Sequence, residues 1–348
     1  MTKKQTKRIL KIVFIIASIS SLWFVPWILV KAWILPLPDT VQEQVNEAIG
    51  YGLDGMIVYV DQRGKEPAFY AAGWKNREKK IPTDPHLLFK IASISKLYVA
   101  VAVTKLVNDN RLSLDKTLTD YLPEFAGSIE NADKITLRMM VQHRSGIPNF
   151  TDTPGYWENP PKTDKENLEL VLDKPADFKP GEDYEYSNTN YLLIGKILDK
   201  TLGYSHHQYI KREILIPLGL NNTYSLLSEV DLDDVMSGYD IGYDGDLKQN
   251  DFINPAGSMV ATAEDVGIFL RALNDGSLLN DNEQAIYSSI YEYEHTGLLP
   301  GYSSIAKYHK DIDAVVVQFV NTSGGYTWNL SEIVYNHILK ILRKQNHI

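Results

Sequence analysis

The chain contains 348 residues, of which 44% are hydrophobic and 23% are charged. This composition is ordinary for a globular protein and excludes a disordered or low-complexity chain. The length allows two domains or one large α/β domain. The chain contains no cysteine, which excludes disulfide frameworks, thiolate catalysis and metal sites built from cysteine.

Charge is distributed unevenly along the chain, whose net charge is −9. Residues 1–38 carry six basic side chains and no acidic one. The remaining residues therefore hold 29 of the 35 basic side chains and all 44 acidic ones, a net charge of −15. Because nucleic-acid binding requires a basic face, we expect no nucleic-acid partner.

A long apolar segment follows the basic N-terminus. Residues 12–30 form a run of 19 residues without a charge. A helix of that length would span roughly 28 Å, about the hydrocarbon core of a bilayer. Trp23, Trp27 and Trp33 lie toward its end, where amphipathic rings favour a membrane interface. The sequence predicts a transmembrane helix over about residues 12–30.

Two other interpretations of this segment are weaker. A buried core helix usually carries a polar stripe, whereas this segment offers only serines. A signal peptide cut near Ser18-x-Ser20 would leave the apolar residues 22–30 on the mature protein. We therefore expect an uncut single-pass anchor within residues 1–38, embedded in the cell membrane with its basic end in the cytoplasm. Residues 39–348 would form an extracytoplasmic domain.

Beyond the anchor, hydrophobic periodicity and turn residues predict strands at both ends of the chain and helices between them. The predicted strands are residues 55–60, 67–74, 303–308 and 314–320. The predicted helices are residues 93–107, 136–143, 190–201, 207–215, 262–274 and 330–343, and the predicted loops are residues 108–135, 154–180 and 229–256. This order indicates an α/β (α+β) fold, with one sheet made from both chain ends and a mostly helical subdomain inserted between them.

The first candidate for catalysis is the sequence Ser-Ile-Ser-Lys at residues 93–96. In a helix, Ser93 and Lys96 would lie on one face, one turn apart. A serine hydroxyl is a weak nucleophile without a base, and a desolvated lysine can serve because burial lowers its pKa. Two more Ser-x-x-Lys matches begin at Ser113 and Ser304. The first lies in a loop and the second in a predicted strand, where residues three apart face opposite ways.

A second candidate, Tyr186-Ser187-Asn188, is the only Tyr-x-Asn sequence in the chain. A phenol beside a cationic lysine can ionise and carry a proton to a leaving group. An amide can orient the acyl donor by hydrogen bonding. By itself the triplet also fits a helix-capping asparagine beside a core tyrosine.

A third candidate, His295-Thr296-Gly297, precedes the predicted late strands. Gly297 would permit close approach of a substrate to the backbone. The Thr296 hydroxyl can hydrogen-bond a substrate carboxylate or amide, and the N–H of Leu298 can contribute to an oxyanion hole. We expect all three residues of the triplet to bind substrate.

The remaining histidines carry weaker signals. We expect His143 to be structural, with its ring bonded to a backbone carbonyl at a helix end. The pair His206-His207 looks exposed at a helix start, and metal binding there is a minor alternative. The sequence contains no Gly-x-Ser-x-Gly elbow, no His-Glu-x-x-His and no phosphate-binding glycine loop.

In this order, the three motifs resemble those of the serine β-lactamase and penicillin-binding-protein superfamily. The branch that the sequence resembles most is the group of class C β-lactamases, DD-peptidases and esterases. The resemblance covers residues 45–343 and includes residues 89–96, 136–148, 180–191, 217–220, 256–265 and 295–302. It implies a β-lactamase/DD-peptidase-like fold, in which a central antiparallel sheet is flanked by helices and carries an inserted all-α subdomain.

The resemblance also implies roles for individual residues. Ser93 would be acylated and then released by water, while Lys96 and Tyr186 share the general-base and general-acid roles in an order that the sequence leaves open. Asn188 would position the substrate, and the N–H groups of Ser93 and Leu298 would form the oxyanion hole. The resemblance implies no metal and no cofactor.

One residue departs from the family pattern, because many members carry lysine where this chain has His295. A lysine is charged at pH 7 and suits a free carboxylate, whereas histidine is mostly neutral. We therefore expect weaker capture of a carboxylate and a preference for esters or amides that lack one. An acidic domain would also attract the ammonium of a D-alanyl ester, although the phosphates of a teichoic acid oppose this effect.

The leading interpretation is an extracytoplasmic serine hydrolase that acts on D-alanyl groups of the cell envelope. It would be a D-alanyl-D-alanine carboxypeptidase for the peptidoglycan stem peptide or an esterase for D-alanylated teichoic acid. The alternatives are a penicillin-binding sensor or scaffold with little turnover, a β-lactamase, and an inactive binding module. The complete set of catalytic residue types argues against the last. The sequence does not indicate the oligomeric state.

Overall fold

The computed structural model describes residues 3–346, and its centre is a six-stranded antiparallel sheet with the order β3-β2-β1-β10-β9-β8. Strand β1 pairs with β10, in the register Met56 to Val320, so the two ends of the chain meet in the middle of the sheet. The strand bounds are β1 Gly55–Gln62, β2 Ala68–Asn76, β3 Ile81–Pro82, β8 His295–Leu299, β9 Tyr302–His309 and β10 Ala314–Val320. The prediction of one sheet from both chain ends is confirmed.

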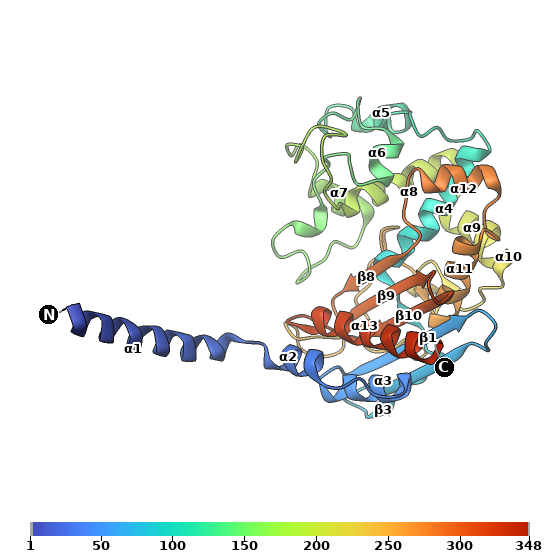
Figure 1. Ribbon diagram of the computed structural model, residues 1–348. Helices are drawn as coiled ribbons and strands as arrows, with labels where there is room; N and C mark the ends of the chain where they lie inside the picture. The colour runs from blue at the N-terminus through green and yellow to red at the C-terminus, as the bar shows by residue number, and fades with distance from the viewer. Residues whose placement is uncertain (1–2, 347–348) are drawn as a thin grey trace.

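The two faces of the sheet pack against different helices because side chains alternate along a strand. In β1, Met56 and Val58 join an apolar cluster with α3 (Val41–Gly50) and α13 (Thr327–Asn346). Ile57 and Tyr59 face the other way and join the larger cluster that includes α11 (Ala263–Asp275). Figure 1 shows this layered part below the helical region.

The helical region is built around α4 (Ser95–Asn108) and α8 (Asn188–Leu202). Most residues of α4 are buried on all sides, as expected for a helix that is apolar around its whole circumference. The helices around this pair are α5 Leu118–Tyr121, α6 Leu137–Val141, α7 Asp164–Glu169, α9 His206–Ile210, α10 Ile216–Leu218 and α12 Asp281–Ser288. The short strands are β4 Phe89–Lys90, β5 Thr223–Tyr224, β6 Tyr239–Asp240, β7 Val260–Ala261 and β11 Thr322–Ser323.

The structure differs from the predicted elements in three places. The helix predicted over residues 207–215 is divided into α9 and a π-helical turn, Lys211–Leu215. Short helices α5 and α7 interrupt segments predicted as loops. The triplet that begins at His295 precedes the late strands, as predicted, and itself forms a further strand, β8, at the edge of the sheet.

The prediction of a single helix over residues 12–30 is wrong. The chain forms α1 (Lys3–Ser21), a 3₁₀ turn and α2 (Trp27–Ile34), and the two helical parts meet at an angle of 78°. Pro26 lies at the break, where proline lacks an N–H and disfavours helix in the residue before it. Among residues 3–346, no one helix is both long and apolar enough to cross a bilayer, and only this bent pair has the length and composition.

Candidate active site

The two sequence motifs at the starts of α4 and α8 meet at one hydroxyl group. Ser93 lies in the 3₁₀ turn Ala92–Ile94 that leads into α4. Its Oγ accepts a hydrogen bond from the Tyr186 hydroxyl at 2.8 Å and lies 3.1 Å from Lys96 Nζ. The structure therefore brings together the three residues predicted to catalyse the reaction.

The turn that presents Ser93 has an unusual backbone. Ala92 has a φ of +52°, a left-handed conformation that costs an alanine about 1–2 kcal/mol. The Ser95 hydroxyl holds the turn by donating to the Ala92 carbonyl at 2.7 Å and accepting from the Met259 N–H at 3.2 Å. Surrounding contacts thus maintain a strained backbone directly before the candidate nucleophile, as is common at functional sites.

Lys96 is fully buried and has no carboxylate partner. Its Nζ lies 2.8 Å from Asn188 Oδ1 and 2.7 Å from the Ala256 carbonyl oxygen, in addition to Ser93 Oγ. Burial lowers the pKa of Lys96 well below its usual value. The Asn188 and Ala256 oxygens can only accept, so a neutral amine donates both of its protons to them. Its lone pair is then left for the Ser93 hydroxyl.

The pKa of Tyr186 is shifted in the opposite direction from that of Lys96. Burial raises its pKa above the ordinary value, although the hydrogen bond with Ser93 opposes the shift. The phenol is therefore protonated at neutral pH and donates to Ser93. The Lys96 Nζ lies 4.8 Å from the centre of the Tyr186 ring, close enough for the charge state of one group to affect the other.

Asn188 is held from both sides at the start of α8. Its Oδ1 accepts from Lys96, and its Nδ2 donates to the Thr151 hydroxyl at 3.2 Å. Its backbone N–H donates to Asn149 Oδ1 at 3.0 Å. These contacts fix the amide beside Lys96, and the role of Asn188 in positioning the substrate stays a prediction.

Strand β8 runs directly beside the turn that carries Ser93. A Cβ atom on Gly297 would lie 2.4 Å from the Ile91 carbonyl oxygen and 3.0 Å from the Ala92 Cβ. Only glycine allows this approach. The Ser304 hydroxyl, in β9, donates to Ile91 O at 3.2 Å and ties the two segments together. Ser304 thus has a structural role, as its strand position predicted.

His295 lies among aromatic rings at the start of β8. Its ring stacks on Tyr291, with centroids 6.0 Å apart and planes 15° apart, and its Nδ1 contacts the Thr296 carbonyl oxygen. Burial, with a smaller effect of the Lys96 charge, lowers the pKa of His295 to about 4. The ring is therefore neutral at pH 7, as the sequence predicted. Leu298 has a side chain that is 53% exposed, and the oxyanion-hole role of its N–H stays a prediction.

His143 makes structural contacts at the end of α6, as predicted, but the predicted partner of its ring is wrong. Its ring does not bind a carbonyl; instead Nδ1 accepts the Ser187 N–H at 3.1 Å, and the ring stacks on Tyr186 at 4.4 Å. Its own carbonyl accepts the Glu185 N–H at 3.0 Å. Burial lowers the pKa of His143 to about 3, so the ring is neutral. Sequence reasoning missed this contact because the two segments are far apart in the chain.

The remaining histidine pair does not form a metal site. His206 is buried, not exposed as predicted, and its Nδ1 lies 2.7 Å from Asp199 Oδ1. Within residues 3–346 no group of three or more His, Cys, Asp or Glu side chains is placed to hold a metal ion. The pair therefore belongs to the packing of α8 against α9.

Two hollows adjoin the site and differ in chemistry. One of about 380 Å³ is lined by Tyr186, His143, Tyr291, Glu292 and His295 among others. At the other end of β8, a hollow of about 260 Å³ is mostly apolar. Its lining includes Trp157, Tyr243, Leu298, Leu299 and Pro300. The hollow with more polar side chains thus lies at the start of β8 and the mostly apolar one at its end.

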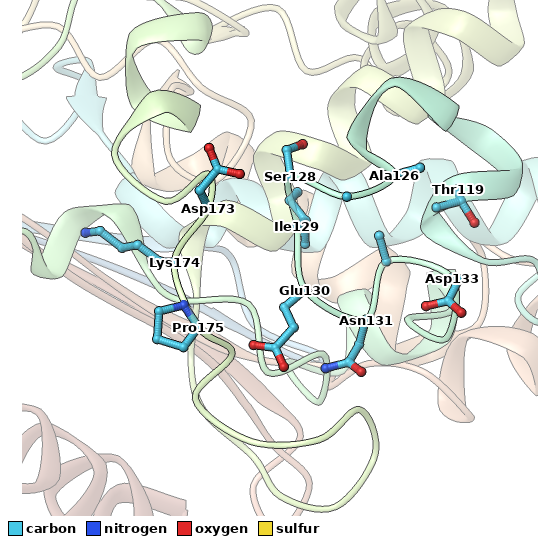
Figure 2. Close-up of a pocket in the computed structure, with 12 residues that line it drawn as sticks. Thr119, Ala126, Ser128, Ile129, Glu130, Asn131, Asp133, Asp173, Lys174 and Pro175 are labelled. Carbon is cyan, nitrogen blue, oxygen red and sulfur yellow. The ribbon is translucent and has the colours of Figure 1, made fainter.

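A third hollow lies within the helical region, away from Ser93. Figure 2 shows it between residues 126–133 and residues 173–175, and its volume is about 680 Å³. Its labelled side chains include Glu130, Asp133, Asp173 and Lys174. None of the candidate catalytic or substrate-binding residues lines it, so it forms no part of the candidate active site.

Known proteins with similar sequences include Protein flp and a penicillin-binding protein. The chain is 27% identical to Protein flp of Staphylococcus aureus (strain MW2) over 193 residues, which cover 54% of this chain and 39% of that protein. It is 27% identical to penicillin-binding protein 4* of Bacillus subtilis (strain 168) over 161 residues, which cover 44% and 34%. The matches thus span well under half the length of these relatives.

Among solved structures, D-amino acid amidase from Ochrobactrum anthropi SV3 has the same fold, with a TM-score of 0.77. The match covers 88% of this chain and 98% of the amidase at 23% sequence identity. The family model Beta-lactamase matches residues 37–289, most of the chain. The predicted β-lactamase/DD-peptidase-like fold is confirmed, and the chain belongs to the beta-lactamase family of serine hydrolases, within the serine β-lactamase and penicillin-binding-protein superfamily.

Proposed function

We propose that this protein hydrolyses D-alanyl groups of the bacterial cell envelope through an acyl-enzyme on Ser93, as a D-alanyl-D-alanine carboxypeptidase or a D-alanyl (teichoic acid) esterase. One observation carries the proposal. The Ser93 Oγ lies between Lys96 Nζ, at 3.1 Å, and the Tyr186 hydroxyl, at 2.8 Å. Since Lys96 is buried without a carboxylate partner, it is available as a neutral base.

The arrangement supports the following acylation step. The Lys96 amine takes the proton of Ser93 as Oγ attacks the substrate carbonyl carbon. The N–H groups of Ser93 and Leu298 stabilise the oxyanion. Tyr186, protonated in the resting enzyme, gives its proton to the leaving oxygen or nitrogen, and Lys96 returns a proton to Tyr186. Water then attacks the ester on Ser93 in the reverse sequence, which releases the acid and restores the free serine.

The surroundings of the site favour a substrate without a free carboxylate next to the scissile bond. The neutral His295 stands where many family members carry a charged lysine. The adjoining hollow is lined by both Glu292 and Arg144, so its charged side chains do not favour a carboxylate over an ammonium. The similarity to a D-amino acid amidase supports a D-aminoacyl substrate. Between the two activities, these features favour the esterase.

We also propose that the protein is anchored in the cell membrane, with the catalytic domain outside the cytoplasm. The basic side chains within residues 3–11 and the uncharged remainder of α1, residues 12–21, support this orientation under the positive-inside rule. The envelope substrates named above lie on that side. The bilayer and the envelope polymer would then be the partners of the chain.

The first experiment tests the nucleophile. We would incubate the full chain in detergent with a fluorescent penicillin and follow the labelled band over time, beside Ser93→Ala. We expect label on the wild type and none on the variant. A label lost in seconds would indicate a β-lactamase, and one that persists for hours a penicillin-binding sensor. Equal labelling of both proteins would contradict the proposal.

The second experiment tests the substrate. We would compare kcat/KM for a D-alanyl-D-alanine peptide and for a D-alanine ester, in the wild type and in His295→Lys. We expect the wild type to favour the ester, and the variant to shift the ratio toward the peptide by about tenfold, equivalent to about 1.4 kcal/mol. A wild type that loses most of its activity when the substrate carboxylate is removed would refute this preference.

A further inference from the structure

The bend between α1 and α2 exposes a cluster of large apolar side chains. We call Trp23, Phe24, Trp27, Trp33 and Ile34 the bend patch. Their exposed fractions are 91%, 83%, 56%, 70% and 65%. Soluble surfaces rarely concentrate so much aromatic area in a segment of twelve residues, and such patches mark interaction sites. Within the described chain, these side chains have no covering element.

The bend itself is held by hydrogen bonds. The Trp27 indole N–H donates to the Leu22 carbonyl at 3.0 Å, and the Trp27 backbone N–H donates to the Val25 carbonyl at 2.8 Å. Pro26 prevents a continuous helix across this point. The angle of 78° between α1 and α2 is thus part of the fold rather than a loose joint.

The opposite face of α2 belongs to the catalytic domain. Ala32 is 1% exposed and lies in the apolar cluster of α3 and α13, and Leu29 packs against the same cluster. The Lys31 ammonium lies over the Tyr51 ring at 5.9 Å. The connection from α2 to α3 is only residues 35–40, which include two prolines. No long flexible linker therefore separates the domain from α2.

We propose that α2 lies flat in the outer interface of the bilayer into which α1 inserts, so that the bend patch enters the lipid and holds the catalytic domain against the membrane. Residues 12–24, the uncharged part of α1 and its turn, span roughly 20 Å at 1.5 Å per residue. This is shorter than the roughly 30 Å hydrocarbon core. A bilayer accommodates such a mismatch by thinning and by flanking basic side chains that reach the interface, so the bend falls near the outer interface. Tryptophan favours that depth, and a helix nearly perpendicular to α1 lies in the membrane plane.

We infer that lipid covers the bend patch because the patch continues the apolar surface of α1. The large apolar side chains of α1 from Ile9 to Ile19 are all exposed, and a bilayer that covers them reaches the patch without a gap. Figure 1 shows α1 leaving the molecule at the end where α2 and α3 lie, away from the helical region. The inference rests on the proposed membrane anchoring and is independent of the hydrolase activity.

The absence of cysteine from the chain allows a direct test with single labels on the full-length protein. We would prepare Phe14→Cys, Ile34→Cys and Ile216→Cys, attach an environment-sensitive fluorophore, and reconstitute each in phosphatidylethanolamine–phosphatidylglycerol vesicles. Ile216, in α10, is 66% exposed and serves as the control on the domain. Quenching by doxyl-labelled lipid reports contact with the bilayer. We expect at least twofold quenching at positions 14 and 34 and none at 216.

A disruptive variant sharpens the test. Trp33→Asp in the Ile34→Cys protein should at least halve the quenching at position 34, whereas Ile216→Asp should not change it. If position 34 behaves like 216 while 14 is quenched, the domain stands away from the membrane and the inference is wrong. If position 14 is not quenched either, the anchoring itself fails, and acylation of Ser93 still reports separately on the hydrolase.

Discussion

His143 holds the loop of Tyr186 by two hydrogen bonds and a ring contact. Its ring accepts the Ser187 N–H, its carbonyl accepts the Glu185 N–H, and its imidazole stacks on the Tyr186 ring. His143 also has a φ of +56°, which asparagine tolerates better than most residues. These contacts allow two substitutions that separate hydrogen bonding from stacking.

We predict that His143→Phe lowers the rate of acylation at least tenfold with little change in KM. The phenyl ring keeps the stacking but leaves the Ser187 N–H buried and unpaired, which costs about 1–3 kcal/mol. His143→Asn restores an acceptor and accepts the left-handed backbone, so it should retain more activity than the phenylalanine variant. Single-turnover acylation by the two variants is the measurement. Equal loss in both would show that the hydrogen bond does not position Tyr186.

The residues of the three motifs were predictable because each carries chemistry that is visible in a short stretch of sequence. In the structure a chain of hydrogen-bonding contacts links Tyr186 to Ser93, Ser93 to Lys96, and Lys96 to Asn188. The role of His143 was not predictable, since an imidazole that accepts an N–H from a distant loop leaves no local pattern. The positive φ of Ala92 could not be predicted from the sequence for the same reason.

At the level of elements, the contact between β8 and the turn before α4 defines the site. Gly297 allows the strand to approach Ile91 and Ala92, and the Ser304 hydroxyl bridges the two segments. This contact places the edge of the sheet beside Ser93. Any side chain larger than hydrogen at position 297 must separate the strand from the turn.

We predict that Gly297→Ala reduces the acylation rate at least a hundredfold and lowers the melting temperature. The new Cβ would lie 2.4 Å from the Ile91 carbonyl oxygen, a backbone atom that cannot rotate away. Gly50→Ala is the matched control, because a Cβ there meets nothing within 4 Å. Labelling kinetics and thermal unfolding of both variants test this. Wild-type labelling by Gly297→Ala would mean that the close approach is not required.

The order of the elements was predictable, but some of their ends and breaks were not. The strands of the sheet alternate or are β-branched, so β1, β2, β9 and β10 appear in the sequence pattern. The apolar run of residues 12–30 does not reveal that α2 turns away to pack on α3 and α13. Hydropathy shows that a segment tends to leave water, but it does not show whether lipid or protein will cover that segment.

For the molecule as a whole, neutral buried histidines predict how stability varies with pH. The pKa of His143 and His207 is lowered to about 3 and that of His295 to about 4, in each case chiefly by burial. Near pH 5 to 6 the unfolded chain therefore binds more protons at these sites than the native protein does. The contribution of these histidines to the free energy of unfolding is complete above pH 6.5. It decreases as the pH falls toward 4 and then 3.

We predict that acidification from pH 6.5 to pH 5 lowers the free energy of unfolding by up to about 1.4 kcal/mol per pH unit for each such histidine. His207 lies outside the candidate active site. The substitution His207→Gln should remove one of these contributions and make the free energy of unfolding vary less with pH. Urea unfolding of both proteins at pH 7, 6 and 5 provides the comparison. Parallel profiles for the wild type and the variant would contradict the assignment.

The pairing of β1 with β10 also determines when the protein can fold. Met56 pairs with Val320, so the centre of the sheet joins a strand that is synthesised early to one that is synthesised late. Folding that depends on such distant contacts is slow, because a long loop must close first. Until residues 314–320 emerge, β1 has a free hydrogen-bonding edge that is prone to mispairing. We therefore expect a chain that ends before β10 to aggregate more readily than the full-length protein.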